Sequence, residues 1–125
     1  MASFDANTLR ELRDVHEVTI RTEKHPKIAV VIWVVVVDDE VFVRSWLGYK
    51  GRWYRDVAAG GPATLEFGAH RLAVQAIPEH DPDAVAKASR EFLKKYQPSS
   101  HAQEMVRSEI LPTTLRLEFR SLAGT

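Results

Sequence analysis

The chain has 125 residues, of which 45% are hydrophobic and 27% charged, and it contains no cysteine. This composition predicts one globular domain, and the lack of cysteine excludes disulfides, thiolate metal sites and cysteine nucleophiles. Seventeen Lys and Arg balance seventeen Asp and Glu, so no overall field attracts nucleic acid or an anionic membrane. We expect a cytoplasmic protein, because the N-terminus lacks an apolar signal core and the longest apolar run is too short to span a bilayer.

The first elements in chain order are a helix and two strands. Asp5 or Asn7 is a suitable N-cap for a helix near the N-terminus. Residues 16–22 alternate apolar and polar side chains, as a half-buried strand does. The run IAVVIWVVVV, 28–37, is rich in β-branched residues. Its continuous apolarity predicts one strand covered on both faces, in a barrel or at a dimer contact.

The middle of the chain is predicted as a hairpin, a loop and a short helix. The acidic triplet 38–40 separates the apolar run from a strand over 41–46. Because this triplet has no glycine, we expect a loop of three or more residues rather than the tightest hairpin turn. The flexible segment GYKG follows, and a short helix over 53–59 ends at Gly60-Gly61-Pro62.

The second half of the chain alternates between strands and helices. Residues 63–77 are predicted as a second hairpin or one bent strand, with Gly68 at the turn or at a bulge. The clearest helix begins after Asp81, a good N-cap, with Pro82 in the first helical position. A short helix over about 101–108 and the last strand, TTLRLEF, follow. This order suggests an α+β fold with an antiparallel, barrel-like sheet.

Several familiar site motifs are absent from the sequence. The five histidines have no spacing that would pair them on a metal ion, so we expect no metal site. The sequence has no GxSxG elbow, Walker A loop or GxGxxG segment. GYKG matches the GxxG pattern of KH-type RNA-binding loops, but it follows a strand where a KH fold needs a helix. Neutral overall charge also argues against nucleic acid as a partner.

The stretch RSWLGYKGRWYR, residues 44–55, holds four cations and four aromatic residues but no acid. The remaining chain has 13 cations against 17 acids, a net charge of −4, so the positive charge is local. A local patch favours a bound anion over an extended polyanion. Arginine can grip a phosphate through two parallel hydrogen bonds, and aromatic rings stack on a heterocycle. Strand alternation predicts Phe42, Arg44 and Trp46 on one face and Val41, Val43 and Ser45 on the other.

Two other interpretations of this stretch stay open. Trp46, Trp53 and Tyr54 can be core residues, with Arg and Lys stems covering them and charged heads in water. Cation–π contacts would then account for the interleaving of cations and rings. Single-stranded nucleic-acid binding is the third interpretation, and it predicts an oligonucleotide affinity that falls steeply with salt.

From ELRDVHEVTI to TTLRLEF, the chain resembles a family of small uncharacterised bacterial split-barrel proteins. The matching residues are IWVVVVDDEVFVRSWLG, Trp53-Tyr54-Arg55, Lys95-Tyr96 and TTLRL at 113–117. The fold is similar to that of pyridoxamine phosphate oxidase-like flavin proteins and deazaflavin-dependent nitroreductases. The resemblance implies a single FMN-binding-like split β-barrel domain over 1–125, and a homodimer with a small anionic cofactor near the subunit interface.

The resemblance to these cofactor-binding proteins is strongest at FVRSWLGYKGRWYRDVAA. It implies FMN or a deazaflavin as cofactor and an oxidoreductase reaction whose catalytic residues it does not identify. Tyr54 is the best candidate for a proton donor or substrate contact. The cofactor-binding residues that the resemblance implies, for the phosphate, the glycine loop and the pocket, are Arg44, Ser45, Gly48, Lys50, Arg52, Trp53 and Tyr54.

Three positions in this stretch depart from the pattern of the relatives. Arg52 replaces a proline, Asp56 replaces an asparagine, and Gly48 replaces the serine of the flavin oxidases. Asp56 would repel a phosphate unless it pairs with Arg52 or Arg55. The alternative function is therefore a non-catalytic dimeric module that has lost the cofactor and binds another anionic small molecule or none.

Overall fold

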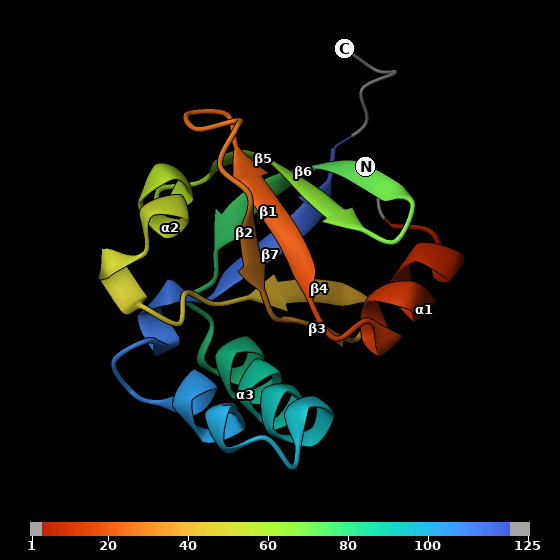
Figure 1. Ribbon diagram of the computed structural model, residues 1–125. Helices are drawn as coiled ribbons and strands as arrows, with labels where there is room; N and C mark the ends of the chain where they lie inside the picture. Colours follow the sequence, from red (N-terminus) through yellow and green to blue (C-terminus); the bar gives the residue numbers. More distant parts are fainter. Residues whose placement is uncertain (1–3, 121–125) are drawn as a thin grey trace.

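Seven antiparallel strands form one sheet that curls until its two edges almost meet (Figure 1). The computed structural model describes residues 4–120. The strand order in the sheet is β2-β1-β5-β6-β7-β4-β3. The prediction of an α+β fold with a barrel-like antiparallel sheet is confirmed. The strands are β1 (Val18–Thr22), β2 (Val30–Ile32), β3 (Val34–Val37), β4 (Glu40–Val43), β5 (Gly61–Phe67), β6 (His70–Pro78) and β7 (Leu115–Phe119).

The helices lie around this barrel, with α3 beneath β3 and β4 (Figure 1). Asp5 caps α1, because its carboxylate accepts a hydrogen bond from the backbone N–H of Thr8 at 2.7 Å. Asp81 caps α3 and Pro82 stands in its first turn, as predicted. The helices are α1 (Ala6–Asp14), α2 (Arg52–Val57), α3 (Pro82–Tyr96) and the short 3-10 helices η1 (Gly48–Lys50), η2 (Ser100–Val106) and η3 (Leu111–Thr113).

The apolar run 28–37 forms two strands, β2 and β3, joined by the single residue Trp33. β2 pairs only with β1 and β3 only with β4, so these consecutive strands are the two edges of the sheet. The prediction of one continuous strand is wrong, because the run crosses from one edge of the barrel to the other. The alternation nevertheless stays in phase, since Ile32 and Val34 enter the barrel core while Trp33 and Val35 pack on the opposite side, toward α3.

The hairpin between β3 and β4 is tighter than predicted. Val37 pairs with Glu40, so Asp38 and Asp39 form a two-residue turn with φ values of 49° and 66°. Aspartate is one of the few residues besides glycine that adopts this left-handed region, because its short side chain can hydrogen-bond locally. The expectation of a longer loop is therefore wrong. Of the two alternatives for residues 63–77, the hairpin is the one that forms, between β5 and β6 with Gly68 in its turn.

The end of α3 contacts the backbone of Val34 at the free edge of β3. The Tyr96 hydroxyl accepts a hydrogen bond from Val34 N at 3.0 Å and contacts Val34 O at 3.1 Å. Lys95 Nζ donates to Val34 O at 2.7 Å and to Leu12 O at 2.9 Å. These contacts join α3, α1 and the edge strand at one point. Burial lowers the pKa of Lys95 to about 8.

Two apolar cores meet across β3 and β4. The inner core fills the barrel, and the outer core lies between these strands and the helices α3 and η2. Val41 and Val43 point into the inner core, while Phe42 belongs to the outer one, so the predicted alternation of this strand is confirmed. The principal buried residues of the outer core are Val35, Phe42, Ala88, Phe92, Tyr96, Ala102, Met105 and Ile110.

Candidate functional site

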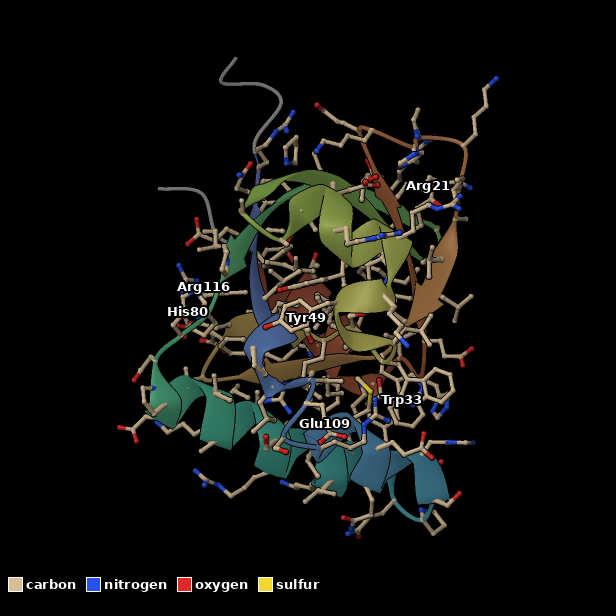
Figure 2. The ribbon with its side chains drawn as sticks, turned by 90° about the vertical axis from the view of Figure 1, so that its left-hand side faces the viewer. Arg21, Trp33, Tyr49, His80, Glu109 and Arg116 are labelled. Carbon is tan, nitrogen blue, oxygen red and sulfur yellow. The ribbon has the colours of Figure 1, made fainter. Side chains whose placement is uncertain are left out.

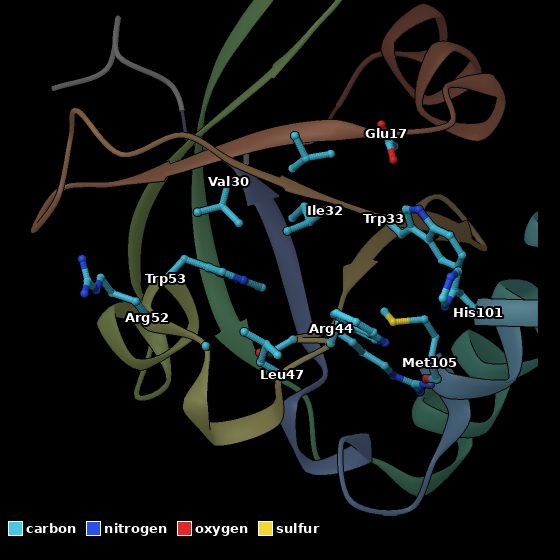
Figure 3. A pocket seen from close by; sticks show the side chains of 14 residues that line it. Glu17, Val30, Ile32, Trp33, Arg44, Leu47, Arg52, Trp53, His101 and Met105 are labelled. Carbon is cyan, nitrogen blue, oxygen red and sulfur yellow. The ribbon is translucent and has the colours of Figure 1, made fainter.

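A pocket of about 490 Å³ lies beside the gap between the sheet edges (Figure 3). Its walls are mostly apolar and come from parts of the chain that are far apart in the sequence. They are β2 with Trp33, the segment 44–47 after β4, residues 51–53 at the start of α2, Glu17, and His101 and Met105 of η2. The volume lies within the usual range of small-molecule sites.

Arg44 directly follows β4 and is only 1% exposed. Its Nε donates to Thr114 Oγ1 at 2.8 Å, and its Nη1 donates to Ser89 Oγ and to Met105 O, both at 2.9 Å. Its Nη2 donates to Val85 O at 2.8 Å. Arg44 therefore ties α3, η2 and the start of β7 to β4, and four of its five N–H groups are used within the protein.

The positive charge of Arg44 has no carboxylate partner within residues 4–120. Burial lowers its pKa to about 10, so the guanidinium remains protonated at neutral pH. Its Cζ lies 5.2 Å from the centre of the Phe92 ring, a cation–π contact. A buried charge is less screened than an exposed one. The wall of the pocket therefore carries an uncompensated positive charge that favours an anion.

Ser45 and two glycines fix the loop that follows β4. The Ser45 hydroxyl donates to Gly48 O at 2.7 Å, and Ser45 N donates to Thr113 Oγ1 at 3.1 Å. Gly48 has a φ of 63°, a conformation that L side chains rarely adopt. A Cβ atom on Gly51 would clash with Ser45 Oγ. This close approach explains why the loop needs glycine at position 51.

Gly51→Ala is expected to lower the free energy of unfolding by about 1–3 kcal/mol, because the new methyl group overpacks against Ser45. Adding Ser45→Ala removes the clashing oxygen. The double variant should therefore lose less unfolding free energy than the two single variants lose in total. Urea denaturation of both single variants and the double variant measures this coupling. Strictly additive losses would contradict the clash.

The pocket brings together four of the residues predicted to bind a cofactor: Arg44, Ser45, Arg52 and Trp53. Gly48, Lys50 and Tyr54 lie outside its lining. Lys50 is exposed, whereas Tyr54 is buried in the barrel core, where burial raises the pKa of its phenol.

Trp53 is 7% exposed and extends its indole into the pocket (Figure 3). Its Nε1–H has no hydrogen-bond partner in the described part of the chain. Every fully buried side-chain nitrogen in that part has a partner, so this N–H must be reached by solvent. The pocket thus contains an unused hydrogen-bond donor in an apolar wall.

The rim of the pocket combines exposed apolar residues with an anchored tryptophan. Val31 and Leu47 are each 60% exposed and Trp46 is 50% exposed. The Trp46 indole donates to Glu104 Oε1 at 2.6 Å, and Arg107 Nη2 donates to Trp46 O at 2.7 Å. The hydrogen bond from Trp46 is the main reason that the pKa of Glu104 lies below its ordinary value. These contacts hold the 44–47 segment against η2.

Sequence reasoning missed the walls that β2, Trp33 and η2 supply. Trp33 lies at the boundary between the barrel and the helices (Figure 2), and its ring stacks on Tyr96 with centroids 3.9 Å apart. The one available signal was that Trp33 interrupts a run of aliphatic residues. No local pattern indicates that Met105 or His101 faces the same space.

Within residues 4–120, no three histidine or acidic side chains gather as a metal site. No helix in that range has the length and apolarity needed to cross a bilayer.

Two crystal structures share this fold. One is a candidate general stress protein 26 from Jannaschia sp. CCS1, with a TM-score of 0.64 and 11% identity over 89% of this chain and 70% of that one. The other is the conserved hypothetical protein Rv2991 from Mycobacterium tuberculosis, with a TM-score of 0.62 and 12% identity over 98% of this chain and 82% of that one. At such low identity these similarities show the fold alone.

The search of curated proteins finds no match to this chain. Residues 7–117 match the family described as "Uncharacterized protein conserved in bacteria (DUF2255)", which covers most of the chain and nearly all of the described structure. The chain therefore belongs to the DUF2255 family.

Proposed function

We propose that the pocket binds a flavin-type nucleotide, FMN or a deazaflavin, and that the bound ring carries out redox chemistry on a small molecule. The observation that carries this proposal is the Trp53 indole N–H, a donor without a partner in residues 4–120 on a side chain that lines the pocket. Water can reach this donor, and a ligand atom that accepts its hydrogen bond can replace that water. A planar ring with an acceptor atom at its edge would accept the hydrogen bond of this N–H.

The pocket suits the ring of such a cofactor. Ile32, Leu47 and Met105 provide apolar contact surface, and Trp53 provides the donor. The exposed guanidinium of Arg52 also lines the pocket and is free to take a phosphate, while Arg44 contributes its charge rather than its N–H groups. When bound, the cofactor supplies the electron transfer, and these residues bind and orient it.

We further propose that the protein is a homodimer whose subunits meet over the pocket rim. The exposed side chains of Val31, Trp46 and Leu47 gather at this rim, and Tyr49 on η1 is 61% exposed. Contiguous exposed apolar surface of this kind marks an interaction site. A second subunit would cover these residues and exclude water from the bound ring.

The test is a titration of the purified protein with FMN and, separately, with a deazaflavin, following ring fluorescence. We expect saturable binding that Trp53→Phe weakens by about threefold to tenfold, the value of one hydrogen bond. Arg52→Gln should weaken binding of FMN but not of riboflavin, which lacks the phosphate. Arg90→Gln, on the exposed side of α3, is the control and should bind as the unchanged protein does.

Failure of the folded protein to bind either compound would support the alternative, a non-catalytic dimeric module that binds another anion or none. One observation favours this alternative. Four of the five N–H groups of Arg44 already donate hydrogen bonds within the protein, to Thr114, Ser89, Met105 and Val85, so they are not available to a phosphate.

A further inference from the structure

A second cavity, of about 240 Å³, borders the other half of α2. Arg52 and Trp53 at the start of this helix line the first pocket, whereas Arg55, Asp56 and Val57 line the second. The remaining walls are the end of β1 with the two residues after it, 22–24, and the turn 59–62 that leads into β5. This cavity plays no part in the function proposed above.

Asp56 is the most enclosed charged group of this cavity, with a side chain that is 9% exposed. Its Oδ2 accepts a hydrogen bond from Thr22 Oγ1 at 2.6 Å and lies 2.6 Å from His25 Nδ1. Burial by itself would raise the pKa of Asp56, but the bonds from Thr22 and His25 and the charge of Lys24 outweigh it and hold the pKa below its ordinary value. The carboxylate is therefore ionised at neutral pH.

The other oxygen of this carboxylate is unused. No donor within residues 4–120 reaches Asp56 Oδ1. Every fully buried side-chain oxygen in that range has a partner, so Oδ1 must be reached by solvent. Since Asp56 lines the cavity, this oxygen is an acceptor available to a ligand there. An ionised carboxylate oxygen accepts a charge-assisted hydrogen bond from a hydroxyl donor, which is stronger than a bond between neutral groups.

Two cations line the same cavity. Lys24 and Arg55 are exposed, and neither forms an ion pair with an acid within residues 4–120. Glu23 also lines the cavity, but its carboxylate lies 3.8 Å from Arg120, which offsets its charge. Lys24 and Arg55 together then exceed the charge of Asp56, which disfavours a metal ion and favours an anion. A matching ligand must offer a hydroxyl to Asp56 and, a short distance away, a negative group to the two cations.

We infer that this cavity binds a small hydroxylated anion, whose hydroxyl group donates to Asp56 Oδ1 and whose phosphate or carboxylate is held by Lys24 and Arg55. The volume is too small for a dinucleotide and sufficient for a three- or four-carbon compound. His25 contacts the same carboxylate, so its ring resonances report on occupancy.

The test follows the His25 ring signals by NMR at constant pH and ionic strength, without flavin. The probes are glycerol 3-phosphate, D-glycerate, inorganic phosphate and glycerol. We expect saturable shifts with glycerol 3-phosphate or D-glycerate, the better of which identifies the anionic group, and at least about fivefold weaker binding of inorganic phosphate. Glycerol alone should produce no saturable shift. Absence of saturation with both hydroxylated anions, or equal binding of inorganic phosphate, would overturn the inference.

Two variants assign the contacts. Asp56→Asn keeps the shape of the side chain but weakens the acceptor. The ratio of the affinity for the hydroxylated anion to the affinity for inorganic phosphate should therefore fall toward one. Arg55→Gln, at an exposed position that does not threaten folding, should weaken both anions together, and Arg90→Gln should change neither. An unchanged preference in folded Asp56→Asn, or unchanged affinities in Arg55→Gln, would sink the assignment. Flavin binding in the first pocket is measured separately, so each proposal fails or stands alone.

Discussion

Replacing Arg44 with methionine is expected to lower the free energy of unfolding by about 3–5 kcal/mol, because several acceptors lose their donor and each buried acceptor left unpaired costs about 1–3 kcal/mol. Methionine fills much of the space of the arginine stem but donates no hydrogen bond. The buried acceptors Thr114 Oγ1, Met105 O and Val85 O would lose their charged partner. Urea denaturation followed by far-UV circular dichroism measures the change.

Arg52→Met is the matched control for Arg44→Met. Arg52 belongs to the same basic stretch and lines the same pocket, but its side chain is exposed and has no hydrogen bond within residues 4–120. Its replacement should change stability by no more than about 0.5 kcal/mol. If both variants unfold at the same urea concentration, Arg44 does not hold α3 and η2 against the end of β4. Because Arg44 stabilises the fold and Arg52 does not, a loss of ligand binding in an Arg44 variant can result from unfolding as well as from a changed pocket.

Deletion of Trp33 is expected to abolish cooperative folding. The inward positions of β2 and β3 stay in phase because a single residue joins the strands. Removing that residue would turn the inward face of one strand outward, since side chains alternate with a period of two. Either Ile32 or Val34, both buried in the barrel, would then face away from it. Circular dichroism and urea denaturation would show a loss of the unfolding transition.

Trp33→Leu separates the length of the connection from its side chain. This variant keeps the register and gives up the stacking of the indole on Tyr96, so we expect a loss of about 1–3 kcal/mol with cooperative unfolding retained. A deletion variant that unfolds cooperatively at a similar urea concentration would show that the two strands are not locked in register.

Local chemistry predicted the elements whose signals lie within a few residues. Asp81 followed by Pro82 predicted the start of α3, and Gly68 marked the turn of the β5–β6 hairpin. Alternation placed Phe42 and Arg44 on the same side of the chain, and both contact the outer core. It did not show that α3 and η2 cover this side, so an arginine expected at a phosphate is instead enclosed by carbonyl and hydroxyl groups.

The remaining differences depend on contacts between distant residues. Nothing within the run 28–37 shows that the barrel closes at Trp33, because both halves have the same β-branched composition. The expected strand over 41–46 ends at Val43, and residues 44–47 line the pocket. Of the expected cofactor residues, the pocket gathers Arg44, Ser45, Arg52 and Trp53. Its other walls come mainly from β2, Trp33 and η2.

The contacts of α3 with Val34 limit how a second chain can pair with the edge of β3 through its backbone. An open strand edge is a template on which a second chain can add a strand, in an ordered assembly or in an aggregate. The Tyr96 hydroxyl and the Lys95 ammonium occupy the backbone groups of Val34 that such a strand would need. Among the described strands, β2 is the other edge of the sheet, and it is only three residues long. A short edge offers few backbone hydrogen bonds, so the barrel combines a valine-rich sequence with little opportunity for fibre growth.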